Sequence, residues 1–137
     1  EQVNQYTSPD GRLVLFAGDS LYLTADDLPL ARFDIIWDRA AFTVLNLSDS
    51  NGYAAFTSGL FSKDEVYLMN VRECDTQKHG GPPASVPKES LLKSFGNAFS
   101  VEEINCINTN DRHRGEQMKR HLLPDDMDEV LYVMRRL

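Results

Sequence analysis

Asp38 and Arg39 are the two residues whose types and position could most clearly do chemistry. They follow Phe33–Trp37, where the continuous apolar run Ile35–Trp37 predicts a strand covered on both faces. Ligands of open parallel sheets bind at the carboxyl ends of such strands. Arginine supplies several hydrogen-bond donors and a charge that it never loses. The pair is therefore a candidate site, and the alternative is a solvated or locally paired surface feature.

Asp19 and Ser20 occupy a similar position. They follow Gly18, directly after Leu13–Ala17, which we predict to be another buried strand. Their side chains could bind a nucleotide base or a ribose. The alternative is that Asp19 merely caps the next turn.

Two loops could contribute further groups. In the first, Pro82 and Pro83 follow two glycines and His79, so the segment combines close backbone approach with stiffness, as a lid over a ligand or a tight crossover loop would. His79 could act as a base or be simply solvated. In the second, Arg112 lies within the charged run 111–114, which could fold over the same sheet edge or remain an exposed cluster. No set of cysteines and histidines has metal-binding spacing, so we predict no metal site.

The elements that position these residues alternate between strands and helices. This order predicts an α/β fold with a mostly parallel sheet and an antiparallel C-terminal strand paired with 99–107. After a turn at 5–12, the expected elements are strands at 13–17 and 33–37, a helix at 49–61, a strand at 65–70, a helix at 87–95, and strands at 99–107 and 129–134.

Composition restricts the possible partners. The chain has 137 residues, enough for one domain with a core, and a formal charge of −7. That charge argues against nucleic acid and anionic membrane surfaces as partners. The sequence contains no membrane-spanning apolar run, and its two cysteines are typical of a reducing compartment. We expect a cytoplasmic protein.

Several of these segments together resemble the thiopurine S-methyltransferase family of class I methyltransferases, which use S-adenosylmethionine. The similar segments are Gly18-Asp19-Ser20, the run 33–41 with its Trp-Asp-Arg-Ala sequence, the run 75–83 with Gly-Pro-Pro, and Arg112-His113 before the last strand. The resemblance covers essentially the whole chain and implies a Rossmann-like sheet. It also implies methylation of a small aromatic or heterocyclic thiol, with S-adenosylhomocysteine as the second product.

The resemblance assigns roles to individual residues. Asp19 and Ser20 match the segment that holds the adenine end of the cofactor, and Arg39 lies near both the cofactor and the methyl acceptor. Pro82 and Pro83 match the loop that closes over the acceptor. Arg112 matches a second arginine beside the reacting sulfur. Arg39 and Arg112 are thus the expected catalytic residues, since an adjacent positive charge favours a thiolate.

One part of the family pattern is missing. The family's first two strands and the glycine-rich turn that holds the methionine part of the cofactor are not in this sequence. We therefore expect residues 1–137 to be one partial methyltransferase domain, whose partners include the N-terminal half or a second copy. The alternative is a degenerate, inactive methyltransferase-like module that serves as a binding scaffold.

Overall fold

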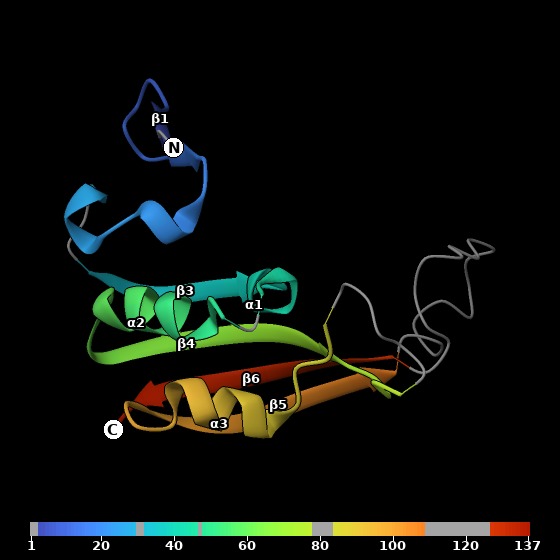
Figure 1. Cartoon of the computed structure of the whole chain (residues 1–137). Helices are drawn as coiled ribbons and strands as arrows, with labels where there is room; N and C mark the ends of the chain where they lie inside the picture. The colour runs from blue at the N-terminus through green and yellow to red at the C-terminus, as the bar shows by residue number, and fades with distance from the viewer. Residues whose placement is uncertain (1–2, 30–31, 47, 78–83, 109–126) are drawn as a thin grey trace.

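The main sheet has strand order β3-β4-β6-β5 (Figure 1). The computed structural model describes residues 3–29, 32–46, 48–77, 84–108 and 127–137. Strands β3 (Phe33–Arg39) and β4 (Phe61–Glu73) are parallel, whereas β6 (Asp128–Arg136) runs antiparallel to both β4 and β5 (Phe99–Asn108). The predicted α/β class and the pairing of the last two strands are confirmed. Only one of these three pairings is parallel, so the described sheet is mixed and not mostly parallel as predicted.

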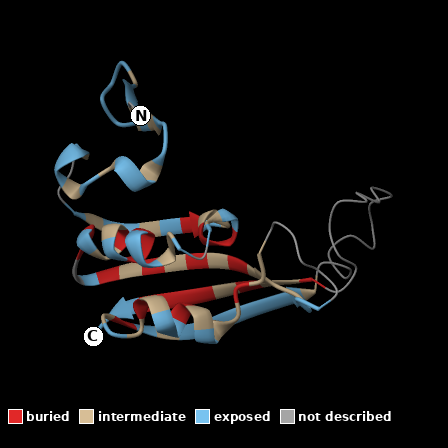
Figure 2. Ribbon diagram, in the orientation of Figure 1, coloured by how far each residue is buried: buried red, intermediate tan, exposed pale blue. Residues whose placement is uncertain are grey.

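Three helices cover one face of this sheet: α1 (Ala41–Val44), α2 (Ser50–Gly59) and α3 (Lys88–Phe95). In α3, Leu91 and Phe95 are four residues apart and point into the core. The Phe95 ring centroid lies 5.5 Å from that of Phe42 and 5.8 Å from that of Tyr67, so one aromatic cluster joins the helices to the strands. The buried residues in Figure 2 lie between these helices and the sheet. No helix in the described ranges is long and apolar enough to span a membrane.

The opposite face of the sheet is open in the described structure. Ile35 is 64% exposed and Trp37 is 54% exposed, so the prediction that 33–37 is covered on both faces is wrong. Side chains alternate along a strand, and here Ile36 packs against the core while Ile35 and Trp37 point away from it. The apolar run indicated a strand correctly, but it could not show which faces other elements cover.

The first two strands of this chain form a hairpin that is separate from the main sheet. Strands β1 (Asn4–Thr7) and β2 (Val14–Ala17) pair with each other, so the predicted turn at 5–12 includes part of a strand. The predicted strand at 13–17 is present but not buried, because Leu13 and Leu15 are each 55% exposed. Two short 3-10 turns, η1 (Ser20–Tyr22) and η2 (Ala25–Asp27), then lead to the main sheet. In the described structure β2 is not paired with β3, and the two strands belong to separate sheets.

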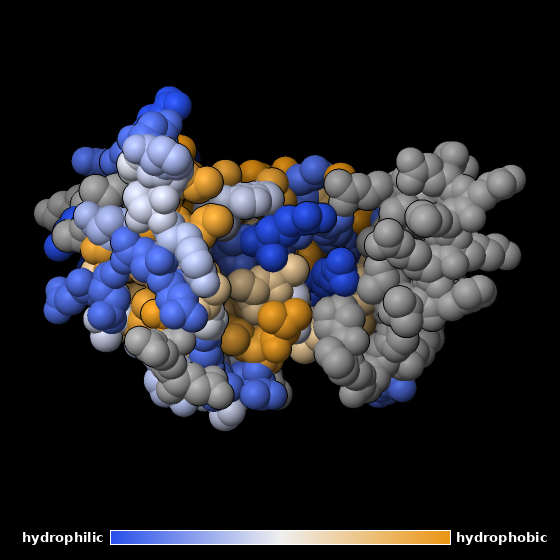
Figure 3. Space-filling model, turned by 90° about the horizontal axis from the view of Figure 1, so that it is seen from above, coloured by the Kyte–Doolittle hydropathy of each residue, from blue (hydrophilic) through white to orange (hydrophobic). Residues whose placement is uncertain are grey.

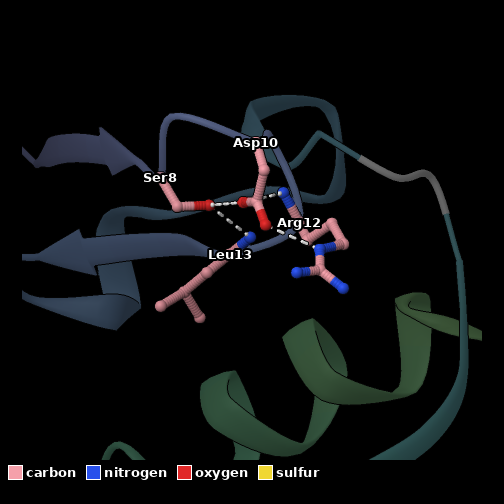
Figure 4. Close-up of polar contacts among 4 residues, drawn as sticks. All are labelled: Ser8, Asp10, Arg12 and Leu13. Carbon is pink, nitrogen blue, oxygen red and sulfur yellow. Dashed lines mark hydrogen bonds and ion pairs between the residues drawn. The ribbon is translucent and has the colours of Figure 1, made fainter.

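Side chains close the hairpin turn (Figure 4). Ser8 Oγ donates a hydrogen bond to Asp10 Oδ1 at 2.7 Å and accepts one from the Leu13 N–H at 3.0 Å. Arg12 Nε lies 2.6 Å from Asp10 Oδ2. The Ser8 hydrogen bond, followed by those from Arg12, lowers the pKa of the Asp10 carboxyl. Local hydrogen bonds therefore stabilise the chain reversal within the turn predicted at 5–12.

Candidate functional site

Arg39 lies at the last position of β3, on the open face of the sheet. The next residue, Ala40, has φ 64° and ψ 7°, a left-handed conformation that is unusual for a residue with a Cβ. Its N–H donates a hydrogen bond of 2.9 Å to the Asn70 carbonyl, and helix α1 begins at Ala41. The strand thus ends sharply and leaves the exposed Arg39 side chain at its carboxyl end.

A shallow hollow of about 240 Å³ lies at this end of the open face, and Arg39 is one of its lining residues. Strand register explains its composition, since Arg39 is opposite Asn70, Asn70 is opposite Leu131, and Leu131 is opposite Asn105. The hollow combines a guanidinium, an indole ring and carboxamides, which together suit a planar polar molecule. Its lining residues are Trp37, Arg39, Asn70, Asn105, Ile107, Glu129 and Leu131.

Sequence reasoning missed most of these residues. Trp37 belongs to the strand predicted at 33–37, and its side chain lines the hollow. Asn70, Asn105 and Glu129 were not singled out, because their proximity depends on how four strands align. The alternation of polar residues along β5 could have indicated its exposed face. It could not have indicated which residues of other strands lie beside it.

Beneath Arg39, Asp38 points to the helix-covered face and is 3% exposed. Its Oδ2 accepts hydrogen bonds from Tyr53 Oη at 2.8 Å and from Tyr67 Oη at 2.9 Å, and its Oδ1 accepts one from the Ala41 N–H at 2.9 Å. Burial, and then the charge of Asp38, raise the pKa of both tyrosine hydroxyls. We refer to Asp38, Tyr53 and Tyr67 as the aspartate clasp.

Asp19 and Ser20 lie on a different part of the molecule. Asp19 Oδ1 accepts a hydrogen bond of 2.9 Å from the Leu21 N–H, so the turn-capping alternative for Asp19 is confirmed. The η1 turn contacts α2, whereas the Arg39 hollow is on the other face of the sheet. Neither residue lines that hollow. The described structure therefore does not bring Asp19 and Ser20 together with Arg39.

A second hollow of about 390 Å³ lies past the end of β4. There Tyr132 Oη donates a hydrogen bond of 2.8 Å to Glu73, and the Cys74 N–H donates one of 3.0 Å to Ser85 Oγ. Its lining is mostly polar and includes Glu73, Cys74, Asp75, Thr76, Ser85, Pro87 and Asp128. Sequence reasoning had not predicted this hollow, because its residues come from three separate segments.

Comparison with known proteins identifies the family of this chain. The family model described as Thiopurine S-methyltransferase (TPMT) matches residues 1–137. The chain belongs to the thiopurine S-methyltransferase family. It is 39% identical over 94 residues to thiopurine S-methyltransferase of Mus spretus, covering 64% of this chain and 38% of the relative. It is 26% identical over 130 residues to probable thiopurine S-methyltransferase of Danio rerio, covering 94% of this chain and 53% of the relative.

The chain thus spans between about a third and a half of these relatives' length. The resemblance recognised in the sequence is confirmed at the level of the family. Of the residues it implicates, Arg39, Asp19 and Ser20 have the positions given above. Pro82, Pro83 and Arg112, together with His79, lie outside the described residues, so their roles stay predictions.

Proposed function

We propose that this chain is part of an S-adenosylmethionine-dependent S-methyltransferase that methylates a small aromatic or heterocyclic thiol. The observation that carries the proposal is the exposed Arg39, in the Trp-Asp-Arg sequence, at the carboxyl end of β3 in a chain of this family. Ligands of α/β sheets bind at such strand ends. Trp37 in the same hollow supplies a ring face for a flat acceptor.

The roles of Asp19 and Ser20 toward the adenosine part of the cofactor are those that the family resemblance implies. Asp19 uses Oδ1 to cap η1, and its exposed side chain has a second carboxylate oxygen that could accept from an amino or hydroxyl group. Ser20 adds a hydroxyl beside it. We propose from the family resemblance that both hold the adenine end, although in the described structure they lie on the other face of the sheet from the Arg39 hollow. When bound, S-adenosylmethionine supplies a methyl group activated by a positively charged sulfur.

Arg39 would act on the acceptor by electrostatics. A guanidinium beside a thiol favours the thiolate and lowers the pKa of that thiol, so no separate base is needed. Alignment of the acceptor supplies much of the remaining rate enhancement in such displacement reactions. In this proposal Arg112 assists in stabilising the sulfur, and Pro82 and Pro83 close over the acceptor.

A binding module is the second candidate. The observation that favours it is the open sheet face, where Ile35 and Trp37 are more than half exposed. Apolar side chains gathered on one face are typical of surfaces that another chain or segment covers. Figure 3 looks from above onto the N-terminal hairpin and the β3 edge, where hydrophobic and hydrophilic residues are interspersed. A scaffold of this kind would not need to bind the cofactor.

Calorimetric titration of S-adenosylmethionine, with intact mass measured on the same sample, separates the two candidates. A methyltransferase binds one cofactor per chain, and an Arg39→Ala variant should lose methyl transfer more severely at neutral than at alkaline pH. Arg135→Ala is the matched control, because Arg135 is also exposed but lies at the other end of the sheet, opposite Val66. Absence of binding by a folded sample would refute the enzyme and favour the module.

A further inference from the structure

The carboxylate of Asp38 is buried, and within the described residues no ion pair to it is found. A buried charge of this kind is costly unless hydrogen bonds stabilise it. Here the three donors, Tyr53 Oη, Tyr67 Oη and the Ala41 N–H, supply that stabilisation.

These donors come from three elements that are far apart in sequence. Tyr53 lies on α2, Tyr67 lies on β4, and Ala41 is the first residue of α1. Turning the Asp38 carboxylate would break several charge-assisted hydrogen bonds at once, so its orientation is fixed. The clasp therefore fastens the end of β3 to the elements around it.

The hydrogen bonds of Asp38 also fix the backbone on both sides of Arg39. The Asp38–Ala41 hydrogen bond spans Arg39 and Ala40, and the Ala40 N–H is held by the Asn70 carbonyl. Because neighbouring residues of a strand point to opposite faces, an Asp38 held inward directs Arg39 outward. The left-handed Ala40 then turns the chain away, so Arg39 does not continue into regular strand or helix.

We propose that Asp38 is a positioning residue for Arg39, and that Tyr53 and Tyr67 act through it. This inference rests on the proposed function, because it assumes that Arg39 contacts the cofactor or the acceptor. In this arrangement the clasp holds the turn 38–41 in one conformation. Loosening it leaves the fold intact but misplaces the guanidinium, and small misplacements of this kind can cost about 100-fold in rate.

The variants for the test are Tyr53→Phe, Tyr67→Phe, their combination, and Asp38→Asn. Each tyrosine variant removes one hydroxyl and leaves the ring, so the aromatic core is kept. Tyr132→Phe is the matched control, because Tyr132 is equally buried and donates a hydrogen bond of 2.8 Å to a carboxylate, that of Glu73. Asp38→Asn keeps the carbonyl oxygen for Ala41 and removes the charge.

Two readouts are measured on the natural-length protein. Amide hydrogen exchange reports how firmly the turn is held, and we expect the double tyrosine variant to speed exchange at Ala41 by about tenfold, with no such change in Tyr132→Phe. Methyl transfer per folded molecule reports Arg39, and we expect kcat or cofactor affinity to fall by about tenfold or more. A merely structural clasp would lower the folded fraction and leave both constants unchanged.

The outcomes are distinguishable. Unchanged kcat, KM and cofactor affinity per folded molecule in the double variant would overturn the proposal, whether or not exchange becomes faster. If Asp38→Asn does not fold, the tyrosine variants still decide. A wild-type protein that neither binds S-adenosylmethionine nor transfers methyl would refute the proposed function itself. The exchange data would then show only whether the clasp holds the turn.

Discussion

Raising the pH should unfold this protein through the two tyrosines of the aspartate clasp. Burial, followed by the charge of Asp38, raises the pKa of Tyr53 and of Tyr67 above the ordinary tyrosine value. The unfolded chain releases these protons near pH 10, roughly, whereas the native state retains them. Their contribution to stability is therefore complete below about pH 10 and is lost as the pH rises above it.

The size of the effect follows from linkage. Each retained proton lowers the free energy of unfolding by about 1.4 kcal/mol per pH unit above the unfolded pKa. The two tyrosines together would remove roughly 3 kcal/mol by about pH 11, against a total of about 5–15 kcal/mol for a typical domain. The loss is large enough to measure by urea unfolding at a series of pH values.

Phenylalanine variants isolate the cause. Tyr67→Phe should be less stable than the wild type at about pH 8, by roughly 1–3 kcal/mol for one hydrogen bond to a charged group. Its disadvantage should shrink by about 1.4 kcal/mol at about pH 11, because it has no proton to lose at this position. Tyr6→Phe is the control, since Tyr6 is 59% exposed. An alkaline slope that is the same in Tyr67→Phe and in the wild type would refute this reasoning.

Three further substitutions test the local structure, each by thermal or urea unfolding. Ala40→Gly should stabilise the fold by up to about 1 kcal/mol, because Ala40 has φ 64° and glycine adopts that region without strain; a lower melting temperature would contradict the left-handed turn. Gly96→Ala should destabilise by about 1–3 kcal/mol, since the added Cβ would meet the backbone oxygen of Leu92; unchanged stability would show that the end of α3 can shift. Phe95→Ala should cost about 3–5 kcal/mol, because its ring is 1% exposed and packs on three other rings; a cost below about 1 kcal/mol would place it outside the core.

Local patterns in the sequence located most of the elements. The predicted helix 87–95 corresponds to α3 at Lys88–Phe95, and the predicted strand 99–107 corresponds to β5 at Phe99–Asn108. The helix expected at 49–61 is the shorter α2 at Ser50–Gly59, and the strand expected at 65–70 is the longer β4 at Phe61–Glu73. Periodicity and turn residues are local signals, so the sequence alone determined the types and order of most elements and the resemblance to the family, whereas strand β1 was predicted to be part of a turn.

Only the tertiary structure decided which faces are covered and which residues meet. Alternation along β3 defines two faces, but it does not show that helices cover the Asp38 face and leave the Trp37 face open. Tyr53 and Tyr67 meet at Asp38 because strand register and helix packing bring together residues 15 and 29 positions away. Contacts at such separations depend on how whole elements pack, and no local pattern encodes them.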